Sequence, residues 1–418
     1  MKINRTTFYS SIFSFLLLSQ VYLPSFKLNI AFQLLTLLYF ISTQKVVISY
    51  SYIKLLSPLL ILLLFPIFIG VVQGNSIANI IKDLSYFLKP TLGLILGYII
   101  FKKINNIEVF VKTVVFSGLI SALIHFVILI FFTNLMSGEV SQIREYGKDN
   151  FLELFSLFVL LTHSKFTKDK LFSKKAHYFY LVLLSFSCLM YLSRTMLIVA
   201  IILYLSIKGY TLIRYRSIKI IAIIISIVLL FYVYLFSVKI DRNAKGFEGF
   251  LYKMKIAPSE IFLSKIDREN HKDLWDHWRG YEANRAFALM KQSPSSYLVG
   301  TGFGSLIDLK FNSPLGDQKK GLRYISEIHN GYVFVLYKTG IIGLLLLLIF
   351  LINLYLKGYH RKNFISIMIS SISVTYFFTT LTITGIFNKR DIIILLLGAF
   401  LYYGTKNEQI VQAADESK

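Results

Sequence analysis

The chain has 418 residues, of which 55% are hydrophobic and only 16% are charged. An ordinary soluble domain carries about 25% charged residues, and so few charges cannot cover the apolar surface of a chain this long. The composition therefore excludes a soluble enzyme, a disordered chain and a nucleic-acid-binding protein, although the formal net charge is +23. It indicates an integral membrane protein, in which excess lysine and arginine usually lie in cytoplasmic loops.

The basic start, Met1 to Arg5, is followed by an apolar stretch that runs to about Phe26. This stretch has no small-residue cleavage site, so we interpret it as a first membrane span rather than as a cleaved signal peptide. A single cysteine, Cys188, lies in an apolar run and can form no disulfide within the chain.

A spanning helix needs about 20 apolar residues, and twelve apolar segments approach that length. We expect spans near residues 8–26, 28–44, 55–73, 84–101, 109–135, 150–164, 178–193, 195–207, 218–238, 329–356, 364–387 and 391–404. We therefore predict an all-α integral membrane protein with about twelve transmembrane helices, several of them short, tilted or partial.

The apolar run 178–207 decides whether the number of membrane crossings is even or odd. As one helix it would be about 45 Å long, which is too long for one untilted crossing and short for two. Both of its flanks are basic: Lys165, Lys168, Lys170, Lys174 and Lys175 precede it, and Lys208, Arg214, Arg216 and Lys219 follow it. Because both flanks are then expected in the cytoplasm, we predict two crossings with a tight turn near Ser193 and Arg194. A single kinked helix is the alternative.

Four regions follow from these spans: transmembrane helices 1–9 in residues 1–238, a periplasmic loop in 239–328, transmembrane helices 10–12 in 329–404, and a cytoplasmic tail in 405–418. The loop holds 11 of the 22 acidic residues and both tryptophans, Trp275 and Trp278. It contains a helix-like stretch from His271 to Gln292 and a Gly-rich turn from Gly300 to Gly304. We expect a structured, partly helical cap on the outer face of the bundle.

Three features on the predicted outer side carry polar chemistry. Arg194 stands between apolar segments, where an arginine costs at least about 2.5–3.5 kcal/mol. It is either a structural arginine at a helix turn or an anion receptor whose guanidinium fork suits phosphate oxygens. Arg279 and Arg285 lie on the loop helix. His329, followed by Asn330, is either an interfacial helix-start residue or a proton acceptor for a substrate hydroxyl.

Residues near these features have interpretations that are purely structural. Asp276 and Glu282 lie three residues either side of Arg279 and are its simplest partners. Gly340 and Gly343 let a neighbouring helix pack closely. The sequence has no carboxylate cluster with metal-ligand spacing, no phosphate-binding Gly-rich loop beside a strand and no nucleophile elbow, so we expect no metal and no cofactor.

Taken together, these patterns resemble the O-antigen ligase and O-antigen polymerase superfamily of bacterial envelopes. His329-Asn330, nine residues and then Gly340-x-x-Gly343 is similar to a family pattern, and Ser193-Arg194-Thr195 resembles the family's Ser-Arg-Thr turn.

A third pattern lies in the loop. Arg279 stands fifteen residues before Pro294, ahead of the Gly-rich turn, as in the family's loop helix. The family often has Trp four residues after that Arg, where this chain has Ala283, and this departure keeps Arg285 as an alternative to Arg279. Arg144 resembles a further basic residue of the family.

The resemblance implies the fold of a membrane-embedded class C glycosyltransferase at the periplasmic face of the bacterial inner membrane. It implies a metal-independent, inverting transfer of an undecaprenyl-diphosphate-linked glycan to an acceptor hydroxyl. His329 would be the catalytic residue, while Arg194, Arg279 or Arg285, and Asn330 would bind substrate. The implied partners are the lipid-linked donor, a glycan or lipid A-core acceptor, the lipid bilayer and a chain-length regulator, with no nucleic acid.

We favour the polymerase over the O-antigen ligase, because polymerases each match one repeat unit and are the more varied class. Two further classes stay open. A lipid-linked oligosaccharide flippase would have a similar number of spans, but a structured outer loop of 90 residues is not expected in it. A scaffolding membrane protein would not need Arg194 between apolar segments.

Overall fold

The structure is a computed structural model. It describes residues 4–416 except 44, 134–149, 243–245, 263–265, 267–269, 314–320 and 361–362, so that Arg144 lies outside the described residues. Each of the twelve predicted apolar segments is helical. The helices are α1 (Arg5–Tyr22), α2 (Phe26–Thr43), α3 (Tyr50–Val72), α4 (Ile77–Ile104), α5 (Ile107–Phe132), α7 (Phe151–Leu161), α8 (Lys174–Met190), α9 (Arg194–Ile207), α10 (Tyr215–Ser237), α15 (Gly331–His360), α16 (Phe364–Thr382) and α17 (Ile393–Glu416).

Seven of the described helices are long and apolar enough to cross a membrane, namely α2, α3, α4, α5, α10, α15 and α16. Shorter apolar helices lie within α7, α9 and α17. The prediction of a mostly helical membrane protein is therefore confirmed, and twelve crossings stay a prediction. Helix α10 is the least enclosed of the seven, since only 6% of its apolar window is buried. Its side chains face outward, as they would toward lipid.

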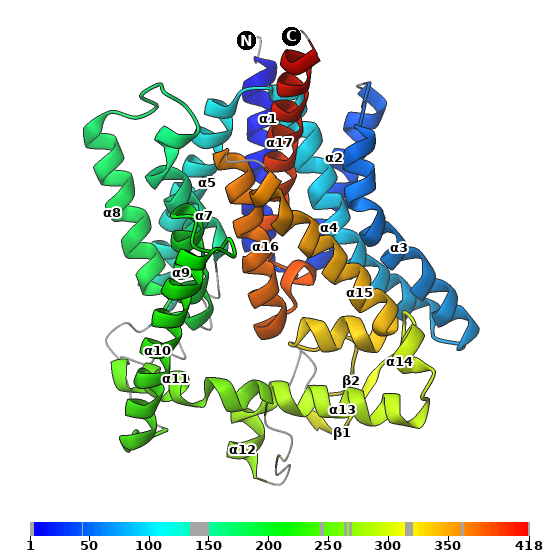
Figure 1. The fold of residues 1–418 in the computed structure, drawn as a ribbon. Coiled ribbons are helices and arrows are strands. Elements are labelled where there is room, and N and C mark those ends of the chain that lie inside the picture. Colours follow the sequence, from blue (N-terminus) through cyan, green and yellow to red (C-terminus); the bar gives the residue numbers. More distant parts are fainter. Residues whose placement is uncertain are drawn as a thin grey trace.

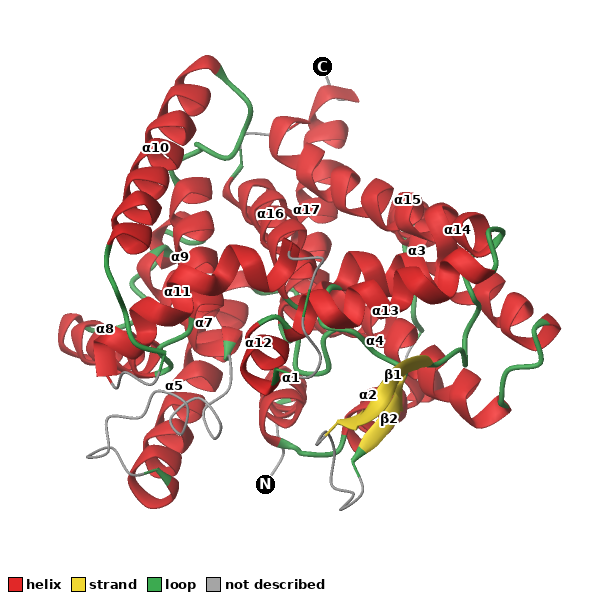
Figure 2. Cartoon of the chain, turned by 90° about the horizontal axis from the view of Figure 1, so that it is seen from below, coloured by secondary structure: helices red, strands yellow, loops and turns green. Residues whose placement is uncertain are grey.

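The region between α10 and α15 forms a cap at one end of the bundle, opposite the two termini (Figure 1). It contains α11 (Gly246–Phe262), α12 (His271–Asp276), α13 (Trp278–Gln292), α14 (Ser296–Val299), β1 (Ile307–Ser313) and β2 (Leu322–Ile325). Seen from that end, α11 and α13 lie across the bundle (Figure 2). The antiparallel hairpin, with Ile307 opposite Ile325, was not predicted. It follows from the alternation of Ile307, Leu309 and Phe311 with polar residues along β1.

The apolar run 178–207 forms two helices, as predicted. They are α8 and α9, joined by Tyr191, Leu192 and Ser193. Leu192 has a left-handed φ of 46°, a conformation that a branched side chain rarely adopts. The tight turn that the basic flanks required is therefore a strained one.

The centre of the bundle is the contact between α4 and α17. A Cβ added at Gly97 would lie 2.1 Å from the carbonyl oxygen of Leu395, and one added at Gly398 would lie 2.3 Å from that of Leu94. These glycines let the two backbones touch. Helices in lipid associate through such close van der Waals packing, because the hydrophobic effect does not drive them together there.

The Gly-rich turn from Gly300 to Gly304 docks the cap on the bundle. Gly302 and Gly304 have φ angles of +71° and +88°, which a residue with a Cβ would adopt only with strain. The amide of Gly304 donates to Oδ2 of Asp83 at 2.7 Å. The same oxygen pairs with Nζ of Lys338 at 2.6 Å, and both charged side chains are fully buried. A buried ion pair therefore holds the cap, α4 and α15 together.

Gly340 has a different role from the close helix packing that its spacing suggested. Its φ of 63° breaks α15 into two parts, and a Cβ at this position would lie 2.2 Å from the carbonyl oxygen of Leu298 on α14. Gly343 faces Thr339 across the kink. The first part of α15 thus lies along the cap, and the second part enters the bundle (Figure 1).

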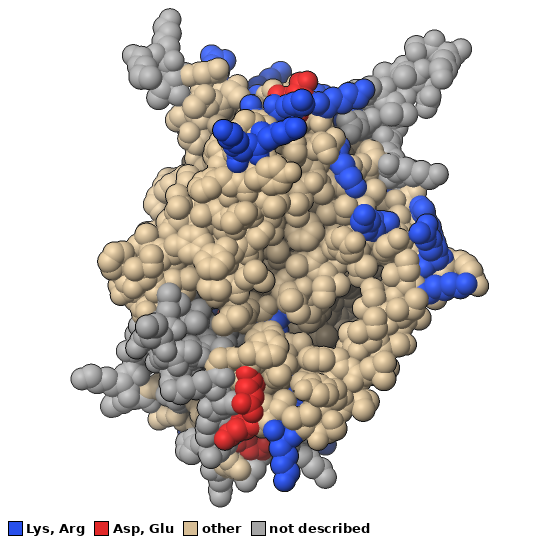
Figure 3. All heavy atoms as spheres, turned by 90° about the vertical axis from the view of Figure 1, so that its left-hand side faces the viewer, with Lys and Arg blue, Asp and Glu red and all other residues tan. Residues whose placement is uncertain are grey.

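The two ends of the molecule differ in charge. Lysine and arginine gather at the end that carries the termini, whereas acidic and basic side chains mix at the cap (Figure 3). The last turn of α4 with Lys102 and Lys103 and the first turn of α8 with Lys174 belong to the basic end. This distribution is the one that cytoplasmic loops usually show.

Candidate active site

His329 is held by a buried carboxylate on the cap helix α13. Its ring Nδ1 lies 2.8 Å from Oε2 of Glu282, and its backbone N–H donates to the same oxygen at 2.9 Å. Glu282 also accepts the indole N–H of Trp278 at 2.7 Å, and its side chain is only 1% exposed. An ionised Glu282 fixes the proton of His329 on Nδ1, so the lone pair of the imidazole lies on Nε2.

The other ring nitrogen of His329 is available. Among the described residues Nε2 has no hydrogen-bond partner, and the side chain is 51% exposed. Partial desolvation of the ring by the surrounding protein lowers the pKa of His329, but the charge and the hydrogen bond of Glu282 outweigh this effect, so the net pKa lies above the usual value. The nearby charge of Arg279 opposes this rise. The Nε2 atom of His329 can therefore accept a proton, and the carboxylate increases the basicity of the ring.

Arg194 and Arg279 share one counter-ion that the sequence did not reveal. Glu260 on α11 accepts from Nη2 of Arg194 at 3.0 Å and from Nη1 of Arg279 at 3.4 Å. Arg194 also donates to the carbonyl oxygen of Lys253. The structure thus joins an arginine at the start of a bundle helix to an arginine of the cap.

The two acidic residues that lie three positions either side of Arg279 have other partners. Asp276 pairs with Arg242 at 2.8 Å, and Glu282 binds His329. The local pairing that the spacing suggested is therefore wrong, because the fold offers both carboxylates partners that lie far away in the sequence. Arg279 pairs with Glu260 instead, and its charge acts on His329.

A polar network in the membrane region holds the turn before Arg194. Ser193 caps α9, since its Oγ accepts the amide of Met196 at 3.2 Å. Glu153 is fully buried, and it accepts hydrogen bonds from Ser121, Asn150, Ser187 and Tyr191. The hydroxyl of Tyr191 reaches it at 2.9 Å. This anchor holds the strained φ of Leu192 and so the position of Arg194.

Arg285 and Asn330 have other partners. Nε of Arg285 donates to the backbone carbonyl of Asp308 at 2.9 Å and ties α13 to β1. Oδ1 of Asn330 accepts the amides of Tyr332 and Val333 at 3.1 and 3.2 Å, which is an N-cap for α15. Of the five predicted site residues, the structure therefore brings together Arg194, Arg279 and His329.

A comparison with known families gives one match. Residues 179–348 match the family model described as O-antigen ligase. This match supports the O-antigen ligase and O-antigen polymerase superfamily. The matched segment runs from α8 to the middle of α15 and includes all five predicted site residues. No curated protein matches the chain.

A cavity of about 330 Å³, whose wall combines charged and polar side chains with apolar ones, lies beside His329, and part of this wall lies outside residues 179–348. Its lining residues are Glu282, Ile325, Glu327, Ile328, His329, Ile383, Thr384, Asn388, Lys389 and Arg390. Lys389 and Arg390 were not among the predicted site residues, although they lie in the short connection between the expected spans 364–387 and 391–404. Two adjacent cations in a loop predicted to lie on the outer side run against the usual charge distribution, and that signal could have identified them.

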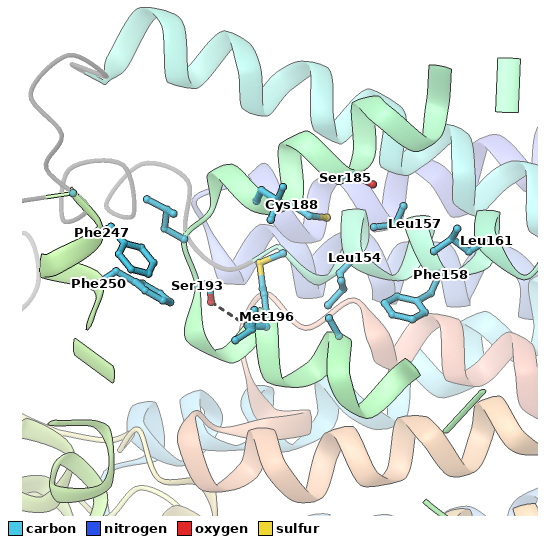
Figure 4. A pocket seen from close by; sticks show the side chains of 15 residues that line it. Leu154, Leu157, Phe158, Leu161, Ser185, Cys188, Ser193, Met196, Phe247 and Phe250 are labelled. Atoms are coloured by element: carbon cyan, nitrogen blue, oxygen red, sulfur yellow. Dashed lines mark hydrogen bonds between the residues drawn. The ribbon is translucent and has the colours of Figure 1, made fainter. Parts of the chain in front are cut away.

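A second, apolar groove of about 650 Å³ reaches Ser193, the residue that precedes Arg194. Side chains of α7, α8 and α9 form its walls, and Phe247 and Phe250 of α11 close the end near Ser193 (Figure 4). It shares no lining residue with the cavity at His329. The chain thus combines an apolar groove, which α7 outside the matched segment helps to form, with an arginine pair and a histidine that has a free ring nitrogen.

Proposed function

We propose that the protein is a metal-independent, inverting membrane glycosyltransferase of the O-antigen polymerase type. It transfers a glycan from undecaprenyl diphosphate to an acceptor hydroxyl. The observation that carries the proposal is the Glu282–His329 pair. It leaves Nε2 of His329 free, and the charge of Arg279 acts on the same ring. Arg279 shares Glu260 with Arg194, so the proton acceptor and the cations belong to one site.

The acceptor hydroxyl binds at His329. In the reaction its oxygen attacks C1 of the donor sugar while its proton passes to Nε2. Glu282 stabilises the imidazolium that forms, since the Nδ1–H of His329 points at its carboxylate. Attack opposite the leaving group inverts the configuration at C1.

The leaving group is the lipid diphosphate. The bond between C1 and the diphosphate oxygen breaks, and its electron pair stays on that oxygen. Arg194 and Arg279 stabilise this charge with preorganised donors, because a guanidinium fork matches phosphate oxygens. In the structure the Glu260 carboxylate pairs with both guanidinium groups. When the donor binds, its diphosphate replaces Glu260 as the partner of the two arginines.

The apolar groove beside Arg194 suits the lipid of the donor. Its lining is almost entirely apolar, and it extends from the membrane region at Leu161 to Ser193. A polyprenyl chain there stays in the bilayer while its diphosphate reaches Arg194.

The charge of the two ends supports an orientation in the bacterial inner membrane with the cap in the periplasm. Cysteine-accessibility labelling in a Cys188→Ser background tests it. A cysteine at position 297, on the exposed Tyr297 of the cap, should react from outside in intact cells, and one at position 174 should not. Labelling of position 174 from outside would contradict the orientation.

The polymerase and the ligase differ in the acceptor. A polymerase uses another lipid-linked repeat unit, and a chain-length regulator would then act with it. The description of the matching family keeps the ligase, with lipid A-core as acceptor, as the second candidate.

The decisive experiment supplies purified protein with lipid-linked repeat units, with and without lipid A-core. Lengthened lipid-linked glycan supports the polymerase, and glycan on lipid A-core supports the ligase. The same transfer in EDTA tests metal independence, and loss of wild-type activity there would contradict it. Movement of the donor across vesicles without any transfer would favour a flippase instead.

A further inference from the structure

The cavity beside His329 has one charge without a counter-ion. Two carboxylates and two permanent cations line it. Glu282 binds His329, and Glu327 pairs with Lys389 at 2.7 Å. Arg390 is the remaining charge, and among the described residues no acceptor takes a hydrogen bond from its guanidinium.

Buried side chains hold the backbone on both sides of Arg390 in place. Nζ of Lys89, which is fully buried, donates to the carbonyl oxygens of Asn388 and Asp391 at 2.5 and 2.9 Å. Gln20, also buried, donates to the carbonyl oxygen of Lys389. A buried ammonium group is costly unless its hydrogen bonds are satisfied. Here it fixes the backbone on both sides of Arg390, which is the construction of a preorganised binding site rather than of a solvated loop.

Burial makes the unpaired guanidinium unfavourable in the absence of a ligand. Arg390 is only partly exposed, and burial lowers its pKa below the usual value. A bound oxyanion would restore the hydrogen bonds and the charge balance that Arg390 lacks. The cavity volume of about 330 Å³ lies at the lower end of the range for small-ligand sites, roughly 300–1,000 Å³.

We propose that this cavity is an acceptor subsite for an acidic sugar, whose carboxylate is bound by Arg390 while a hydroxyl of the acceptor faces His329. The assignment rests on the proposed glycan transfer, because it names the acceptor class of that site. The donor's lipid and diphosphate occupy the groove and the arginine pair, which share no lining residue with this cavity. The acceptor is therefore the substrate that the cavity receives.

The charge count favours a carboxylate over a phosphate ester. Only one cation of the cavity is unpaired, and a guanidinium fork matches a carboxylate with two parallel hydrogen bonds. A doubly charged phosphate would place a second negative charge near Glu282 and Glu327, which are both already present in the cavity. Like charges at such distances repel strongly in a partly dry site.

Binding without donor tests the subsite independently of transfer. The probes are a glucuronic-acid disaccharide, the corresponding glucose disaccharide and glucose 6-phosphate, titrated calorimetrically against the detergent-solubilised protein. We expect Arg390→Gln to weaken binding of the glucuronic-acid disaccharide by roughly 10–100-fold and to leave binding of the glucose disaccharide unchanged. Arg323→Gln is the matched control, because Arg323 pairs with Asp308 and does not line the cavity.

The outcomes separate the subsite from the proposed function. Selective loss of acidic-sugar binding in Arg390→Gln supports the subsite even if no transfer is observed. Equal binding of both disaccharides to the wild-type protein, or equal loss of both in a folded Arg390→Gln, overturns it. Tighter binding of glucose 6-phosphate than of the glucuronic-acid disaccharide would overturn the carboxylate assignment. Arg390→Lys keeps the charge without the fork and should recover only part of the affinity.

Discussion

Neutralising Glu282 is the sharpest test of how His329 works. Glu282 accepts three hydrogen bonds, two from His329 and one from Trp278. Glu282→Gln keeps the shape of the side chain but replaces one oxygen by a donor and removes the charge. The variant therefore separates orientation of the ring from stabilisation of its protonated form.

The magnitude follows from the buried position of the carboxylate. A hydrogen bond to a charged group contributes about 1.5–3 kcal/mol, so losing it when the imidazolium forms should reduce kcat by roughly 10–100-fold. Removal of the base itself in His329→Ala should cost more, about 10²–10⁴-fold.

The pH dependence gives the mechanism-specific signal. His329 accepts a proton only when it is neutral, so activity should rise as the pH rises through its pKa. In the wild-type protein Glu282 raises that pKa above the usual value. Without the carboxylate, burial and the charge of Arg279 lower the pKa, so the rising limb should move to lower pH in Glu282→Gln.

The assay is the pH profile of kcat/KM for transfer from purified lipid-linked donor, normalised to folded protein by thermal unfolding. Asp276→Asn is the matched control, because it neutralises another carboxylate of the cap that pairs with Arg242 and does not contact His329. A rising limb that stays in place in Glu282→Gln, together with full activity of His329→Ala, would refute the assignment of His329 as base.

Three further predictions concern the cations. Arg194→Ala should abolish transfer without lowering the amount of folded protein, and Arg194→Lys should also be poor because a point charge cannot form the bidentate phosphate contact; full activity of the lysine variant would contradict this. Arg279→Ala should raise the KM for the donor more than Arg285→Ala does, and steady-state kinetics with both variants measure the difference. Lys338→Met should cost about 3–5 kcal/mol of stability, because it leaves Asp83 charged and buried. An unchanged unfolding temperature would show that the pair does not hold the cap.

The helices could be predicted from the sequence because each apolar run carries its own signal. The basic flanks of 178–207 sufficed to predict two helices there. The hairpin β1–β2 was missed although Ile307, Leu309 and Phe311 alternate with polar residues, because the surrounding loop gave mainly helical signals. The left-handed kink at Gly340 could not be distinguished from close helix packing, since both require a glycine.

The candidate site was predicted only in part, for a different reason. Motifs place Arg194, Arg279 and His329, but their partners are set by tertiary contacts. Glu282 is 47 residues from His329 in the chain, and Glu260 is 66 residues from Arg194. Proximity along a helix suggested that Glu282 pairs with Arg279, and a local rule of that kind fails once a buried partner competes for the carboxylate.

The position of Lys338 connects the stability of the cap to the chemistry. The first part of α15 begins just after His329 and ends near Lys338, before the kink at Gly340. One end of this short helix is therefore bound by Glu282 on the cap, and the other by Asp83 on α4. The histidine is held between the cap and the bundle, and the shared Glu260 contact spans the same boundary. Since the proposed base and the proposed phosphate-binding cations both depend on this boundary, we infer that the cap is part of the candidate site and not a cover over it.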